Sequence, residues 1–394
     1  MMKKIFTYTF ILVLLLTLTG CWGKRETENL AITSAIGIDQ LNTGGKVMYK
    51  LSAVVLRPGN QGGSSKGSTS ESEQSYEVVE SQGQSLEEAV QNMTPKVPRV
   101  IFFAHAQVLI LGRAVCEGNL NETLDYLLRY PPIRLRSKIY VAKGNAFELL
   151  QAKPTMESDI GKEIYGLGGY GKIQSYGIEE ITLKDFSKKV MTPGIDAWAP
   201  VLEVSVSDKL KKENNLIING LALFKTEKLG GWLNNTETQG FVLAKGEAKQ
   251  GSQTVSIADL GQIACLFNEK KAKISVQIDQ EKRITADIMV KIRGELVESG
   301  SYPLNSLEDF QRAETALNQT LEAHIRSAFK QAQESESDIF GIGRLVEIKD
   351  KALWDSIKEQ WPKMYSEAAI NVKADSIIIR DGLLSKTFSG KLKK

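Results

Sequence analysis

The sequence predicts an α+β protein in which mixed sheets are flanked by helices and a C-terminal antiparallel sheet packs with a long helix. In the first half, stretches with the two-residue period of strands alternate with stretches of helical period. In the last third, two long strand-like runs precede a long amphipathic helix and a final strand, an order typical of α+β folds. The 394 residues also exceed what one core usually holds, so two or three domains are expected.

Residues 1–20 predict a signal peptide. Lys3 and Lys4 supply a positive start, and the apolar run that follows is shorter than the ~20 residues of a spanning helix. Leu18-Thr19-Gly20-Cys21 then fits a lipobox, whose small residues admit a peptidase and whose cysteine accepts lipid. An ordinary signal peptide or an uncleaved anchor with a chance cysteine explains this motif less well. Because two acyl chains suffice for stable anchoring, we expect a mature chain held to a membrane at Cys21 without crossing it.

Charge and cysteine content argue against a nucleic-acid-binding protein and against a fold held by disulfides. Cleavage removes Lys3 and Lys4 and leaves 374 residues (394 minus 20) with net charge +1, so electrostatics gives no argument for nucleic-acid binding. Cys116 and Cys265 lack CxxC spacing and a neighbouring histidine cluster. They could pair in an oxidising compartment, but their distance in the chain favours buried free thiols.

The elements of the first half are predicted in turn. Residues 47–55 alternate as a half-buried strand after the short strand-like piece at 36–39, and the polar stretch at 58–75 predicts a flexible loop. Ser85 opens a helix as a capping box with Glu88. The remaining predicted elements are strands at 101–103, 107–111 and 138–142, a helix at 120–129, and a helix capped by Gly144-Asn145.

The second half begins after an irregular, glycine-rich stretch at 154–200, which predicts a mobile connection. A β-rich unit follows, with strands expected at 217–224 and 240–243. The C-terminal unit is predicted to hold strands at 272–280, 283–297 and 369–379, a long helix capped by Ser306, and a helix at 353–361. The predicted division is a signal peptide at 1–20, an N-terminal α/β domain at 21–200, a middle β-rich domain at 201–270 and a C-terminal α+β domain at 271–394.

Catalysis is the least supported function. The chain holds two histidines, His105 and His324, and no nucleophile, metal or nucleotide motif in a suitable context. We therefore predict no catalytic residue, no metal site and no cofactor.

A basic corner of Arg129, Arg134 and Arg136 surrounds Tyr130-Pro131-Pro132. One interpretation is a docking site for an anion or a partner. The simpler one is a helix C-terminus with favourable cations and a proline stop.

Several blocks, in order, resemble the Ger(x)C family, the lipoprotein C subunits of Ger-type germinant receptors of endospore-forming bacteria. The opening block is Cys21-Trp22-Gly23-Lys24-Arg25-Glu26 with Ile36-Gly37-Ile38-Asp39. The later blocks are residues 83–89, 102–112, 127–134, 220–225, 229–233, 237–240, and 338–343 with Trp354 and Trp361.

The resemblance implies a three-domain α+β lipoprotein ectodomain without enzymatic activity, anchored at the outer face of the inner spore membrane. Its implied partners are polytopic A and B receptor subunits, and any contact with nutrient is expected to be indirect. Trp22, Arg25 and Glu26 beside the anchor are candidates for a membrane-proximal or partner contact, and equally for a short tether. The alternative is a solute-binding lipoprotein of an uptake system, which usually has two similar lobes around a cleft.

Overall fold

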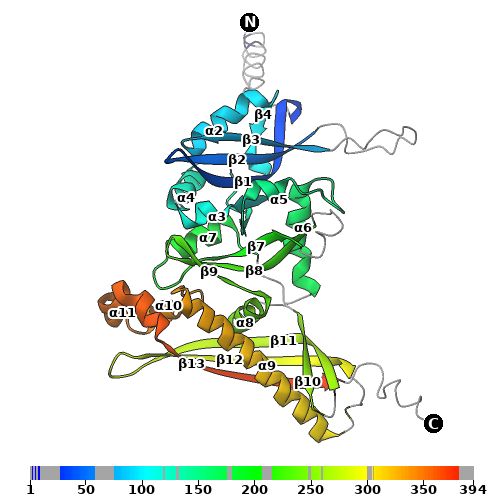
Figure 1. Ribbon diagram of the computed structural model, residues 1–394, viewed down its shortest axis with the longest axis vertical. Coiled ribbons are helices and arrows are strands. Elements are labelled where there is room, and N and C mark those ends of the chain that lie inside the picture. Colours follow the sequence, from blue (N-terminus) through cyan, green and yellow to red (C-terminus); the bar gives the residue numbers. More distant parts are fainter. Residues whose placement is uncertain are drawn as a thin grey trace, which may run out of the picture.

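The computed structural model describes residues 27–57, 75–118, 120–129, 133–174, 180–205, 215–246, 250–258, 261–299, 304 and 306–380, and the single residues 2, 5 and 8. Nearly all of the predicted signal peptide, and the predicted loop at 58–75 apart from Ser75, lie outside these residues. The described part is elongated, with two sheets placed one after the other along its long axis (Figure 1).

The first sheet is mixed and has nine strands in the order β3-β2-β1-β5-β6-β7-β8-β9, with β4 pairing β1. Its centre from β1 to β7 is parallel, and the pairs at either side are antiparallel. The parallel pairs follow from the helices that connect those strands. The strands are β1 (Leu30–Thr43), β2 (Lys46–Leu56), β3 (Tyr76–Gly83), β4 (Val100–Phe102), β5 (Val108–Leu111), β6 (Lys138–Ala142), β7 (Trp198–Val204), β8 (Leu216–Lys225) and β9 (Lys228–Leu233).

Helices cover both faces of this sheet. Leu86, Leu120 and Phe186 bury α2, α4 and α7 in one hydrophobic core, while Ala146 and Ile160 bury α5 and α6 in a second core on the other face. Residues 51–55 of β2 are therefore buried on both faces, more than the half-buried strand that was predicted. The short and long helices here are α2 (Leu86–Met93), η2 (Thr94–Lys96), η3 (Phe103–His105), α3 (Arg113–Glu117), α4 (Leu120–Arg129), α5 (Ala146–Leu150), α6 (Ile160–Gln174) and α7 (Leu183–Val190).

The second sheet has four strands in the order β10-β11-β12-β13, and the long helix α9 crosses it (Figure 1). The predicted C-terminal antiparallel sheet is correct for β10 to β12 but wrong for β13, which runs parallel to β12. The cause is the helical crossover between them, which returns the chain to the start of β12. These elements are α8 (Asn235–Lys245), β10 (Gly251–Ile257), β11 (Gly261–Ile278), β12 (Ile284–Ser299), α9 (Leu307–Glu334), α10 (Ile342–Lys349), α11 (Lys351–Ile357), η5 (Lys358–Gln360), α12 (Trp361–Ser366) and β13 (Ala369–Arg380).

A chain of aromatic rings joins the two sheets. Trp198 of β7 meets Phe241 of α8 edge to face, with ring centroids 5.5 Å apart, and Phe241 meets Phe340 at 5.3 Å. Phe329 of α9 lies 5.2 Å from Phe340 and 5.5 Å from Tyr365. All five residues belong to one hydrophobic core, which therefore extends from the first sheet into the second.

Two sequence predictions in the middle of the chain were wrong. The stretch at 154–200 holds α6, α7 and the start of β7 instead of a mobile connection. The run at 240–243 lies in α8, whose N-terminus is fixed by a capping box of Asn234 and Glu237. Such short apolar runs do not separate helix from strand. The predicted middle unit, residues 201–270, contributes strands to both sheets, and the division into three domains stays a prediction.

Candidate functional site

The predicted lipidation site Cys21 and the predicted contacts Trp22, Arg25 and Glu26 lie outside the described residues. The description resumes at η1 (Thr27–Asn29), which leads directly into β1. Figure 1 places this entry at one end of the long axis, with the second sheet at the opposite end. Within the part of the chain that the structure describes, no helix is both long and apolar enough to cross a bilayer.

The predicted basic corner separates into two parts. The Nε of Arg129 donates to both carboxylate oxygens of Asp125 at 2.7 Å, one turn earlier in α4. Arg129 thus matches the simpler interpretation, a paired cation at a helix C-terminus. Arg134 and Arg136 lie beyond the helix and are exposed, while Ile133 beside them is buried.

The block at 338–343 forms a buried polar junction with α12 and with the first sheet, which we call the Asp338 joint. The Asp338 carboxylate accepts hydrogen bonds from Ile342 N (2.9 Å), Gly343 N (2.7 Å) and Trp361 Nε1 (3.1 Å). Asp196, just before β7, accepts from Asp338 N (2.7 Å) and belongs to the same joint. The side chain of Asp338 is 1 % exposed, so these contacts replace water.

The electrostatics of the joint are dominated by burial. Burial, helped by the neighbouring Asp196 carboxylate, raises the pKa of Asp338 to about 7, although the three N–H donors act to lower it. The pKa of Asp196 is also raised by its burial. A carboxylate held in this way is poised between its two charge states near neutral pH.

Close packing explains the glycines and tryptophans of this block. A Cβ on Gly343 would lie 2.7 Å from the indole of Trp361, and Gly194 O accepts from Arg344 N at 2.7 Å. Trp354 packs edge to face on Trp361 with ring centroids 5.4 Å apart. The structure therefore brings together the aspartate, glycines and tryptophans that the resemblance singled out.

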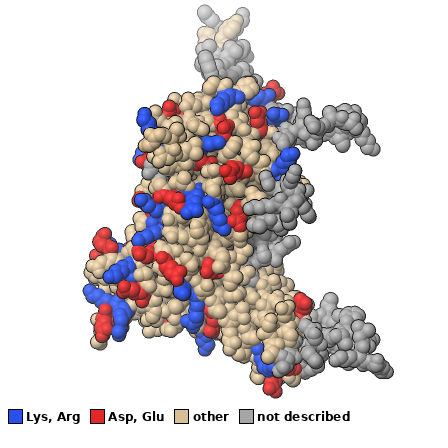
Figure 2. All heavy atoms as spheres, in the orientation of Figure 1, with Lys and Arg blue, Asp and Glu red and all other residues tan. Residues whose placement is uncertain are grey.

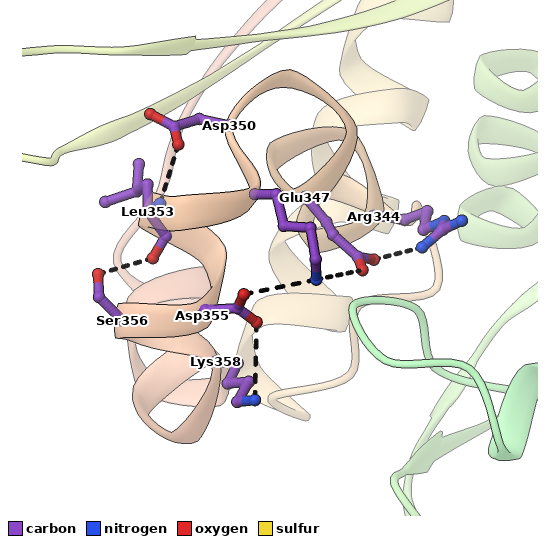
Figure 3. Close-up of polar contacts among 8 residues, drawn as sticks. Arg344, Glu347, Asp350, Leu353, Asp355, Ser356 and Lys358 are labelled. Carbon is purple, nitrogen blue, oxygen red and sulfur yellow. Dashed lines mark hydrogen bonds and ion pairs between the residues drawn. The ribbon is translucent and has the colours of Figure 1, made fainter.

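The outer surface of α10 and α11 carries a chain of alternating charges (Figure 3). Glu347 pairs with Arg344, and Lys351 Nζ lies 4.0 Å from Glu347 and 3.4 Å from Asp355. Lys358 Nζ lies 3.7 Å from Asp355. These surface pairs neutralise one another, and each is worth at most about 1 kcal/mol.

A second buried carboxylate lies in the first sheet. Asp39, in the second half of β1, accepts from Ala146 N (2.7 Å) and Phe147 N (2.9 Å) in the first turn of α5. Burial raises its pKa, while the two backbone donors and Lys50 lower it. Asp39 thus caps α5, whose predicted cap residue Asn145 makes no capping hydrogen bond with its side chain.

The titratable groups form no catalytic set in the described ranges. His105 is exposed on η3, and His324 is partly buried on α9, where burial lowers its pKa. No group of three or more metal-ligating side chains occurs among the described residues. Cys116 and Cys265 are buried free thiols, as predicted, and burial raises the pKa of both.

Two family models match the chain in order. The model described as the spore germination protein N-terminal domain matches residues 23–204, and the model described as spore germination B3/GerAC like, C-terminal, matches residues 219–382. The first match ends with β7 and the second begins within β8, and these two strands are paired in the first sheet.

Relatives match over nearly their whole length. Spore germination protein KC of Bacillus subtilis (strain 168) is 27% identical, with 97% of each chain covered. Spore germination protein B3 of the same organism is 24% identical over 98% of this chain and 100% of the relative. The crystal structure of the GerBC protein superposes with a TM-score of 0.57 at 19% identity, covering 88% of this chain and 98% of that one, which shows a shared fold.

Proposed function

The chain belongs to the spore germination family whose N-terminal and C-terminal models match it, and we propose that it is a non-enzymatic, lipid-anchored subunit of a spore nutrient-germinant receptor. The observation that carries the proposal is the match of both models, in order, over most of the chain. Whole-length similarity to spore germination proteins supports it.

The anchor geometry suits such a subunit. Between Cys21 and Thr27 the chain can span at most about 22 Å. A lipid on Cys21 would therefore keep the β1–β4 end near the bilayer and direct the second sheet away from it (Figure 1). In this proposal the chain lies at the outer face of the inner spore membrane and acts with polytopic A and B subunits. Trp22, Arg25 and Glu26 would lie within the tether, close to lipid or to those subunits.

The alternative function, a solute-binding lipoprotein, finds no support in the fold. That class has two similar lobes around a cleft, whereas this chain has a nine-stranded mixed sheet and a different four-stranded sheet. Titration of the purified mature chain with amino acids, sugars and nucleosides discriminates the two. Tight binding without partners would favour the solute-binding protein.

The test of the proposal is nutrient-triggered germination of spores carrying Cys21→Ala, in a strain where this receptor is the one that answers the nutrient. Thr19→Ser is the matched control, because it keeps the small residue of the lipobox. We expect the alanine variant to leave the membrane fraction and to abolish the response while the control behaves as wild type. Protein levels are followed in parallel. A full response from released protein would refute the anchored-subunit proposal.

A further inference from the structure

A cationic surface lies where the turn before β6 meets the start of α7. Leu183 N donates to Ser137 O (2.9 Å) and Lys184 N donates to Leu135 O (3.0 Å), so the turn and the helix are in direct contact. Arg134, Leu135 and Arg136 are all exposed. We call the five residues Arg134, Leu135, Arg136, Lys184 and Lys188 the α7 basic surface.

Lys184 and Lys188 belong to this surface by helical geometry. They stand four residues apart on α7 and are both exposed, so they share one face of the helix. Figure 2 shows Lys and Arg side chains, with Asp and Glu side chains among them, at the height where Figure 1 places α7. The sequence did not predict this cluster, because nearly fifty residues separate Arg136 from Lys184.

The four cations have no ion-pair partner among the described residues, in contrast to the neutralised chain of charges on α10 and α11. The neighbouring carboxylates accept hydrogen bonds from other residues. Asp185 accepts from Thr182 Oγ1 (2.6 Å), and Asp125 accepts from Arg129. Glu122 accepts from Tyr49 Oη (2.9 Å). The guanidinium and ammonium groups of these four residues can therefore bind the carboxylates of an external partner.

The dipole of α7 favours Lys188 in its last turn, but it does not account for Lys184. Lys184 lies in the first turn of α7, the positive end of the helix dipole, where a cation is unfavourable. Arg134 and Arg136 are exposed in a turn, two residues apart. Leu135 between them is 44% exposed. Arginine around an apolar centre is typical of protein interfaces.

We propose that the α7 basic surface docks an acidic segment of another protein, with Leu135 against an apolar residue of that segment. A protein is favoured over anionic lipid because the surface lies on the flank of the first sheet, below the end at which the chain enters (Figure 1). That the partner is another subunit of the same receptor rests on the proposed function.

The test is photo-crosslinking in spore membranes from the full chain with a benzophenone amino acid at position 135. Position 156 is the control, because Met156 is 92% exposed and lies outside the surface. We expect position 135 to give a crosslinked peptide rich in Asp and Glu from one membrane-protein partner, and position 156 not to. Arg136→Glu with Lys184→Glu should lower the yield about tenfold. The matched double variant Lys351→Glu with Lys358→Glu should leave it unchanged.

A rescue variant separates docking from misfolding. Reversal of two acidic residues to Lys in the crosslinked segment should restore the yield of the Arg136→Glu, Lys184→Glu chain. Crosslinks only to lipid, only to a second copy, or none would overturn the proposal, as would a yield insensitive to the reversals. The Cys21→Ala assay tests the receptor function separately, so an acidic partner outside the receptor would keep the docking surface and contradict only its assignment to that receptor.

Discussion

Asp196 and Asp338 hydrogen-bond to each other twice: Asp196 N donates to Asp338 O (2.9 Å), and Asp338 N donates to the Asp196 carboxylate (2.7 Å). The other carboxylate oxygen of Asp196 accepts from Thr226 N (2.9 Å) in the β8–β9 turn. One aspartate thus fixes the entry to β7, that turn, and the segment after α9. Because the aromatic core continues through the same place, the two sheets are held by polar and apolar contacts together.

The first prediction concerns the stability supplied by Asp338. In Asp338→Asn an amide nitrogen replaces one oxygen and faces N–H donors that then have no acceptor. We expect the free energy of unfolding to fall by about 2–3 kcal/mol, measured by urea denaturation of the mature chain. Asp350→Asn is the control, since Asp350 is an exposed N-cap bonded to Leu353 N (2.9 Å) and asparagine caps about as well. An equal loss of unfolding free energy in both variants would contradict the special role of the buried Asp338 carboxylate.

The second prediction concerns pH. The folded pKa of Asp338, about 7, lies above its ordinary value of 3.8, so the folded state keeps a proton that the unfolded state has lost. Its contribution to stability is fully present below pH ~4 and is lost as pH rises through ~7, by at most about 1.4 kcal/mol per pH unit. Asp39 and Asp196, whose pKa values are also raised, act with the same sign.

The pH-dependent contribution of Asp338 to stability is measured from the urea midpoints of the wild-type chain and of Asp338→Asn between pH 5 and 8. The wild-type stability should fall more steeply with pH than that of the variant, which cannot ionise at this position. The difference removes the opposite contribution of His324, whose lowered pKa destabilises the fold in acid. Parallel curves would show that Asp338 does not titrate in this range.

Local signals predicted elements well wherever side chain and backbone interact over a few residues. Ser306 caps α9 as expected and forms a capping box with Asp309. The Ser85 hydroxyl accepts from Glu88 N as predicted. The Glu88 carboxylate, however, accepts from Gln84 N and not from the N–H of the cap residue Ser85. The alternation at 47–55 likewise gave β2, because a period of two directs side chains to opposite faces of a strand.

The Asp338 joint and the α7 basic surface depend on contacts between residues far apart in the sequence, which local patterns do not predict. Asp338 bonds to Asp196 and to Trp361, which lie 142 and 23 residues away in the sequence. The cluster of Arg136 and Lys184 arises from one turn resting on a distant helix. A signal for the first existed in Asp338-Ile339-Phe340-Gly341, an acidic residue and a glycine ahead of a helical run. No local sequence pattern linked Arg136 to Lys184.

The third prediction concerns the edge of β13, which side chains of α9 cover. Ile378 N donates to Glu314 Oε1 (2.9 Å), Ser376 N to Asn318 Oδ1 (2.9 Å) and Ala374 N to Glu322 Oε1 (3.0 Å). These three bonds form a ladder between α9 residues spaced by four and β13 residues spaced by two. The spacings match because four helical residues rise about 6 Å and two strand residues about 6.7 Å. An open edge strand is a template for aggregation, so the ladder also protects the sheet.

Asn318→Ala should therefore cost about 1–2 kcal/mol of unfolding free energy, although alanine is the better helix former. It should also speed hydrogen exchange at the Ser376 amide. Gln319→Ala is the control, because Gln319 is exposed on the same helix. Unchanged exchange at Ser376 would mean that the ladder does not protect the edge.

The last prediction concerns the crossing of α8 and α9. A Cβ on Gly240 would lie 2.1 Å from His324 O and 2.7 Å from Ile325 N, so only glycine permits the observed approach of the two helices. Gly240→Ala should lower the free energy of unfolding by about 3 kcal/mol, because α8 must move and disturb Phe241 in the aromatic chain. Gly144→Ala is the matched control, since its nearest contact would be the flexible end of Glu148 at 3.9 Å. Thermal unfolding of both variants decides the matter: if they melt together, the helices have room to separate and the tight crossing is not needed for the fold.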